Sequence, residues 1–126
     1  MATINPFFRS GPGRGISEVI WEGMATGDVG APALPGVAGD ISFTATGTIG
    51  TSTLTVEGTD EENPVGTPAT FQTLRSPDSV ALSFTTLPQK KQLLEATKYL
   101  RPQVAGGAGA SGIRVTVLLR RSTPHV

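Results

Sequence analysis

The sequence predicts an all-β fold, an antiparallel two-sheet sandwich of the jelly-roll kind with about eight strands and an extended N-terminal arm. Apolar and polar residues alternate in short runs, as from Thr53 to Glu57 and from Ile113 to Arg120. This period of two is typical of strands with one buried face. Sixteen glycines and ten prolines interrupt the runs and favour tight turns over helices. An immunoglobulin-like sandwich is the alternative architecture.

The length of 126 residues fits one domain with a single core. We divide the chain into an extended N-terminal arm, residues 1–15, and a β-sandwich domain, residues 16–126. Two prolines and three glycines in the arm argue against a regular element there. Phe7 and Phe8 in the arm need an apolar surface, which belongs either to the protein's own sheet or to a partner. We expect the partner.

The first strand of the sandwich, near residues 16–22, is apolar on both faces, as in a strand inside a sandwich or at a subunit contact. Trp21 lies in this strand and either packs in the core or contributes to a subunit contact. The last strand, near residues 112–121, has the clearest alternation. The full set of expected strands lies near residues 16–22, 29–34, 40–46, 52–58, 69–74, 79–85, 97–104 and 112–121.

Alternation within these runs predicts which side chains are buried. In the run near residues 79–85, Val80 shares one face with Leu82 and Phe84. Only Pro88–Thr97 has a helix-like pattern, and a segment this short is marginal as a helix without tertiary support. The expected core comprises Phe43, Leu54, Val56, Leu82, Phe84, Val115 and Val117.

No combination of residues fits a catalytic or metal site, and we expect no enzyme activity, no metal and no cofactor. The absence of cysteine removes thiolate nucleophiles and cysteine-based metal sites. The single histidine, His125, lies next to the C-terminus, where nothing holds its imidazole as a catalytic triad requires. The acidic run Asp60–Glu62 lacks the spacing of a calcium-binding loop, so we interpret it as a solvated hairpin tip.

The charge and hydropathy of the chain restrict its partners. Ten acidic and ten basic side chains balance, which argues against nucleic acid because that partner requires a basic surface. No apolar run approaches the ~18 residues that span a bilayer, so we expect no membrane partner. The first fifteen residues lack the apolar region of a signal peptide, which predicts synthesis in a cytoplasm. A nearly neutral surface with an apolar arm favours self-association, as a dimer or trimer.

Three stretches form an ordered series over about residues 48–121. They are TSTLTVEGTDEENP with ATFQTL, then KYLRPQV, and finally GIRVTVLLRR. The series resembles small structural proteins of tailed bacteriophages, in which a strand with E-G-(S/T)-x-D precedes a loop, a second strand, Y-(L/V)-R-P, a glycine-rich loop and a terminal strand. Among these proteins the chain is similar to the capsid decoration, or cement, proteins, which have a jelly-roll-like β-sandwich.

This resemblance implies a non-enzymatic virion protein, made in the host cytoplasm, that binds the capsid exterior and clamps neighbouring subunits of the major capsid protein. One alternative is another virion structural protein, of head completion or of the tail. The other is a carbohydrate-binding β-sandwich module of the discoidin kind, which usually carries a Trp where this chain has Phe71. The residues expected to contact the partner are Phe7, Phe8, Arg9, Arg14 and Trp21.

Overall fold

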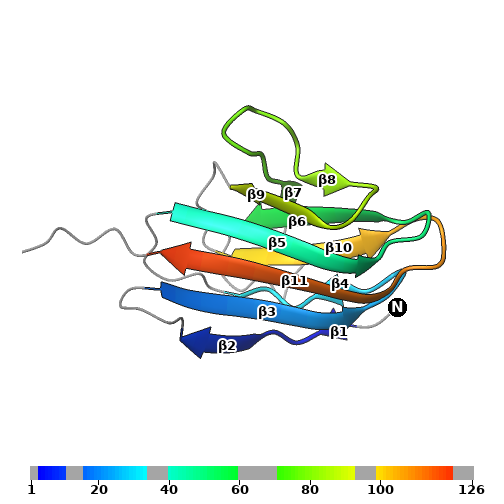
Figure 1. The fold of residues 1–126 in the computed structure, drawn as a ribbon, viewed down its shortest axis with the longest axis horizontal. Helices are drawn as coiled ribbons and strands as arrows, with labels where there is room; N and C mark the ends of the chain where they lie inside the picture. The colour runs from blue at the N-terminus through cyan, green and yellow to red at the C-terminus, as the bar shows by residue number, and fades with distance from the viewer. Residues whose placement is uncertain (1–2, 11–15, 34–39, 60–70, 93–98, 121–126) are drawn as a thin grey trace, which may run out of the picture.

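The protein is described by a computed structural model over residues 3–10, 16–33, 40–59, 71–92 and 99–120. These residues contain eleven strands and no helix (Figure 1), which confirms the all-β prediction. The strands are β1 (Thr3–Ile4), β2 (Phe7–Ser10), β3 (Ile16–Met24), β4 (Val29–Gly30), β5 (Asp40–Thr48), β6 (Thr53–Thr59), β7 (Gln72–Thr73), β8 (Ser83–Phe84), β9 (Gln89–Gln92), β10 (Tyr99–Ala105) and β11 (Ser111–Arg120).

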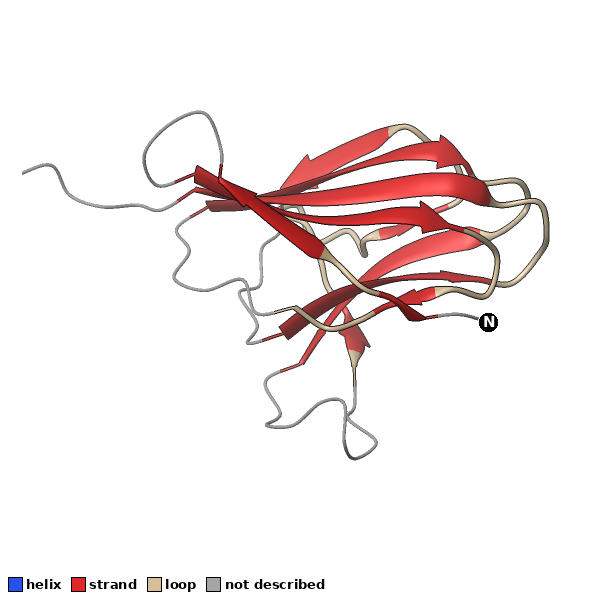
Figure 2. Ribbon diagram, turned by 90° about the horizontal axis from the view of Figure 1, so that it is seen from below, coloured by secondary structure: helices blue, strands red, loops and turns tan. Residues whose placement is uncertain are grey.

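The strands form two layers that face each other (Figure 2). A six-stranded sheet has the order β1-β4-β10-β6-β7, with β8 also paired to β6, and a five-stranded sheet has the order β2-β3-β11-β5-β9. All pairs are antiparallel except β1 with β4, which is parallel. The two-sheet prediction is therefore confirmed, whereas the described residues hold more strands than the expected eight. The jelly-roll connectivity stays a prediction.

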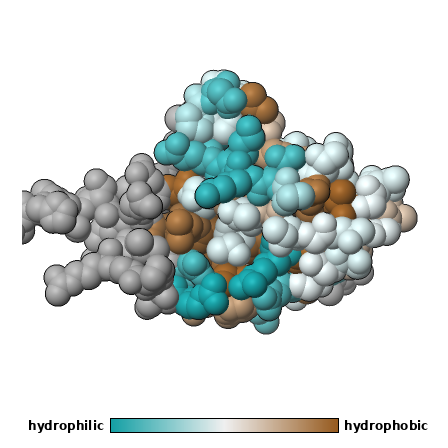
Figure 3. Space-filling view, viewed as in Figure 1, coloured by the Kyte–Doolittle hydropathy of each residue, from teal (hydrophilic) through white to brown (hydrophobic). Residues whose placement is uncertain are grey.

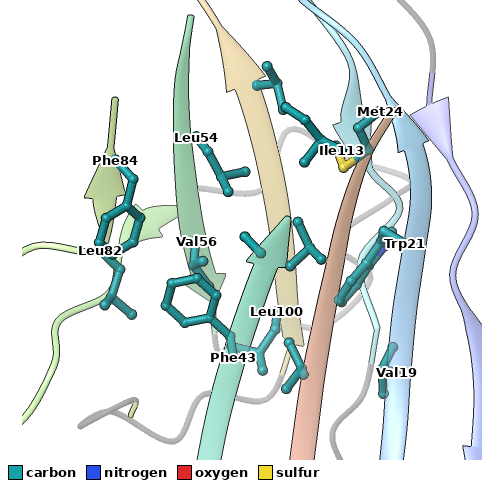
Figure 4. Close-up of a cluster of buried hydrophobic side chains, with 14 of the residues drawn as sticks. Val19, Trp21, Met24, Phe43, Leu54, Val56, Leu82, Phe84, Leu100 and Ile113 are labelled. Carbon is teal, nitrogen blue, oxygen red and sulfur yellow. The ribbon is translucent and has the colours of Figure 1, made fainter. Parts of the chain in front are cut away.

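The core lies between the inner faces of the two sheets (Figure 4). In β11, Val115 and Val117 are at most 1% exposed, while Thr116 between them is partly exposed, so the predicted register is correct. The rings of Phe43 and Phe84 join the two sheets, with centroids 5.4 Å apart and planes tilted by 45°. The seven predicted core residues are all buried: Phe43, Leu54, Val56, Leu82, Phe84, Val115 and Val117.

Strand β3 carries buried side chains on both faces near Trp21, as its sequence predicts. Trp21 points into the core and is 1% exposed, and Ile20 on the opposite face has no exposed surface. The indole Nε1 of Trp21 donates a hydrogen bond to the carbonyl of Ala31 at 3.0 Å, which satisfies its polar group inside the core. Gly30 leaves room for this packing, because a Cβ there would lie 2.7 Å from Trp21 and 2.5 Å from Pro102.

The structure corrects the interpretation of Pro88–Thr97 as a helix-like segment. Its residues Gln89–Gln92 form strand β9, which pairs antiparallel with β5. A helix this short gains little from its own hydrogen bonds, whereas the open edge of β5 offers a ladder of backbone partners. Residues 93–97 lie outside the described part of the chain.

The structure also corrects the expectation that Val80 shares one face with Leu82 and Phe84, since Val80 is 52% exposed whereas the other two are buried. It ends a tight turn in which the amide of Ser76 donates to the carbonyl of Val80 at 2.9 Å and Ser79 has a φ of 66°. The turn reverses the chain before the alternation resumes at Leu82. The hydroxyl of Ser76, which is buried, donates to Asp78, and this hydrogen bond lowers the pKa of the Asp78 carboxyl below its usual value.

Backbone contacts between two loops close one end of the sandwich. The amide of Thr51 donates to the carbonyl of Ala108 at 2.9 Å, and the amide of Ala108 donates to Oγ1 of Thr51 at 2.9 Å. Gly107 lies against Thr51, where a Cβ would be 2.1 Å from the Thr51 carbonyl oxygen, and it has a φ of +58°. Only glycine meets both requirements.

Candidate interaction surface

The N-terminal segment supplies the outermost strand of each sheet on one side of the sandwich. Strand β1 pairs with β4 in the six-stranded sheet, and β2 pairs with β3 in the five-stranded sheet. The segment passes from one layer to the other between these two strands (Figure 2). Residues 3–4 and 7–10 therefore form regular strands, contrary to our expectation for the arm. This pairing supports the alternative in which the arm covers the protein's own sheets, while the division at residue 15 stays a prediction.

Phe7 and Phe8 are the two largest exposed apolar side chains in the described residues, with exposures of 43% and 61%. Phe7 pairs with Ile20, and Phe8 pairs with Val19. Paired residues of antiparallel strands share a face, so Phe7 lies on the outer face of the sheet and Phe8 on the face that carries the core. Both phenyl rings are exposed because β2 is the last strand of its sheet. This arrangement presents two aromatic groups at one sheet edge.

Arg9 lies beside them and is paired with Glu18 of β3. Its Nε and Nη2 donate to Oε2 of Glu18 at 2.8 and 2.6 Å. The Arg9 side chain is 55% exposed, so this ion pair contributes only about 0–1 kcal/mol to stability. The pair holds the guanidinium toward β3 and leaves much of its surface accessible. We refer to Phe7, Phe8 and Arg9 as the β2 edge.

The structure brings together only these three of the five residues that the sequence suggested for partner contact. Trp21 is buried in the core, so its ring is not presented to a partner. Arg14 lies outside the described residues. His125 and the acidic run at residues 60–62 also lie outside them. In the described part of the chain, no group of three or more His, Asp or Glu side chains is placed to hold a metal ion.

A second cluster joins residues that the sequence resemblance quoted as separate motifs. Glu57 of β6 pairs directly with Arg101 of β10, and Nε of Arg101 lies 3.0 Å from Oε1 of Glu57. The guanidinium of Arg101 also lies 3.8 Å from the centroid of the Phe71 ring. The side chains of Glu57 and Arg101 are 14% and 26% exposed, respectively. Alternation places both residues on outward faces, but only the strand pairing shows that they meet.

The outer face of the five-stranded sheet is mostly polar with separate apolar patches (Figure 3). Cross-strand pairs such as Arg9 with Glu18 and Arg114 with Glu22, the latter at 3.2 Å, lie on this face. No helix in the described residues is long and apolar enough to cross a bilayer.

Comparison with known proteins identifies a fold relative from a bacteriophage. The crystal structure of the SPBc2 prophage-derived protein YomS superimposes with a TM-score of 0.59, at 10% sequence identity, over 82% of this chain and 94% of that chain. At this identity the likeness establishes a shared fold. No protein-family model and no curated protein sequence matches the chain.

Proposed function

We propose that this chain is a non-enzymatic structural protein of a tailed-bacteriophage particle, which binds the outer surface of the assembled capsid and clamps neighbouring subunits of the major capsid protein. The observation that carries the proposal is the fold shared with a prophage-derived protein over most of both chains. The ordered motifs that resemble decoration proteins point in the same direction, and two of them meet in the Glu57–Arg101 pair.

The β2 edge is the surface through which such a protein would contact its partners. Phe7 and Phe8 offer large apolar areas, and aromatic side chains of this kind are common anchors of protein interfaces. Arg9 adds charge-assisted hydrogen bonds to carboxylates of the partner. The rest of the protein is a sandwich with a well-packed buried core, which suits a protein that bears mechanical load on a capsid shell.

Cosedimentation with capsids tests this proposal. Capsids of the phage or prophage that encodes the chain are mixed with the full-length protein, pelleted and imaged by electron cryomicroscopy. We expect density on the capsid exterior between neighbouring major capsid subunits, and a higher melting temperature of the decorated shells. Density at the portal or in the tail would instead support the head-completion or tail alternative.

A matched pair of variants tests the role of the β2 edge in capsid binding. The double substitution Phe7→Ser with Phe8→Ser removes both aromatic groups, whereas Val80→Ser removes an exposed apolar side chain far from β2 in the sequence. We expect the double variant to lose most of its capsid binding and Val80→Ser to retain it. Equal binding by the two variants would exclude the β2 edge as a contact surface.

A further inference from the structure

The two outermost strands of the five-stranded sheet differ in character. Strand β9 at one edge carries Lys90 and Lys91, and lysines on an edge strand oppose pairing with another chain. Strand β2 at the other edge carries Phe7 and Phe8, both exposed. Among the described residues, one edge is therefore protected against strand addition, whereas the other is apolar and has no further strand paired to it.

We propose that β2 pairs antiparallel with β2 of a second copy, centred on Phe8, so that two five-stranded sheets join into one across a twofold axis. This inference goes beyond the proposed function, because it gives the self-association expected from the sequence a surface and a register. A second copy fits this edge because an antiparallel strand pair is self-complementary under a twofold axis. The interface is small, and we expect a reversible dimer that depends on concentration and that dissociates when the same edge binds a capsid.

The symmetry of the pairing leaves few registers. A twofold axis perpendicular to the sheet keeps each side chain on its own face, so the axis must pass through a residue pair and not between residues. Centring on Arg9 places two guanidinium groups directly opposite each other, and like charges at opposed positions are destabilising. Centring on Phe7 places Phe8 and Arg9 opposite Pro6 and Asn5, which lie outside β2.

Centring on Phe8 satisfies the chemistry of all three side chains of the β2 edge. Phe8 then faces Phe8 of the second copy, as an aromatic pair on the inner side of the joined sheet. Phe7 faces Arg9 of the second copy on the outer side, where a guanidinium over a phenyl ring is attractive. Arg9 is bonded to Glu18 of β3, and its side chain is still 55% exposed, so its guanidinium is accessible to the Phe7 ring of the second copy. The same chain shows this type of contact between Arg101 and Phe71.

Sedimentation of the free protein tests whether the dimer forms. At high micromolar concentration we expect the full-length protein and its Val80→Ser variant to exceed the monomer mass of 13.0 kDa, approaching twice that value. Phe8→Ser should weaken the dimer by about tenfold or more, because it removes the central aromatic pair. A wild-type protein that stays monomeric, or a Phe8→Ser variant that dimerises as well as Val80→Ser, overturns the proposal.

Cross-linking tests the register and does not depend on the Phe8→Ser variant being folded. The chain has no cysteine, so each of Phe7→Cys, Phe8→Cys and Val80→Cys carries a single thiol. In the proposed register the Cβ atoms at position 8 lie about 4.5–5.5 Å apart and those at position 7 about 7–8 Å apart on a diagonal. At protein concentrations where sedimentation shows that the variants are dimeric to the same extent, we expect Phe8→Cys to form an intermolecular disulfide fastest.

Faster cross-linking at position 7 or position 80 than at position 8 overturns the register. The outcome is separable from that of the proposed function, since these measurements contain no capsid. A dimer with the expected cross-link in a protein that never binds capsids supports this inference and contradicts the capsid proposal. Capsid binding by a protein that remains monomeric in solution and cross-links at random contradicts this inference and supports the capsid proposal.

Discussion

Gly106 and Gly107 are adjacent residues with the same backbone requirement and different surroundings. Both have positive φ, +71° and +58°, yet a Cβ at Gly106 meets nothing within 4 Å, whereas one at Gly107 would lie 2.1 Å from the Thr51 carbonyl oxygen. We expect Gly107→Ala to lower the free energy of unfolding by about 1–2 kcal/mol more than Gly106→Ala, because only the former forces two loops apart. Urea denaturation measures the difference. Equal losses would mean that left-handed backbone strain alone determines both positions.

At the scale of a strand pair, the Glu57–Arg101 contact should stabilise the pairing of β6 with β10 more than the exposed Arg9–Glu18 contact stabilises the pairing of β2 with β3. Both partners of this pair are at most 26% exposed, while Arg9 in the Arg9–Glu18 pair is 55% exposed. We expect a coupling energy of about 1–2 kcal/mol for Glu57–Arg101, against about 0.2–1 kcal/mol for Arg9–Glu18.

Double-mutant cycles with Glu→Gln and Arg→Met substitutions measure both couplings by the same denaturation assay. Added salt should weaken the exposed Arg9–Glu18 coupling more strongly, because water and ions screen it. A larger coupling for the exposed pair would contradict the burial argument and leave cation–π contact with Phe71 as the main contribution of Arg101.

The elements that the sequence predicted well are those whose pattern depends on local geometry alone. The alternation in β11 requires only that one face is buried, so Val115 and Val117 were placed correctly. Strand β9 was missed because its sequence QKKQ has no apolar face, and its state depends on the free edge of β5. For the same reason, β2 is a strand through its pairing with β3, in spite of the proline and glycine residues around it.

The β2 edge likewise could be predicted only in part from the sequence. Phe7, Phe8 and Arg9 are consecutive in the sequence, and two adjacent phenylalanines need an apolar contact. Whether they face the core or solvent depends on which strand pairs with β2 and on its position at the end of the sheet order. The burial of Trp21 also depends on another segment, because Gly30 leaves room for its ring and the Ala31 carbonyl accepts its hydrogen bond.

For the whole molecule, the N-terminal segment couples the two sheets. Strand β1 extends one sheet and β2 extends the other, so deletion of residues 1–10 removes an outer strand from each layer. The deletion also removes Phe7 from beside Ile20, which has no exposed surface in the intact protein. We expect the melting temperature to fall by about 5 °C or more, since about 1 kcal/mol produces a shift of this size in a domain of roughly this length.

The single tryptophan provides the measurement, because Trp21 lies next to Ile20 in β3 and its fluorescence reports the packing of that strand. The Phe8→Ser variant is the control, since it keeps the backbone pairing of β1 and β2 and the contact of Phe7 with Ile20, while it removes the more exposed ring. This control should melt close to the wild-type temperature and yet dimerise more weakly. If instead the deletion melts like the wild type, the segment contributes nothing to the fold, and residues 1–10 serve only to bind a partner, as the sequence alone suggested.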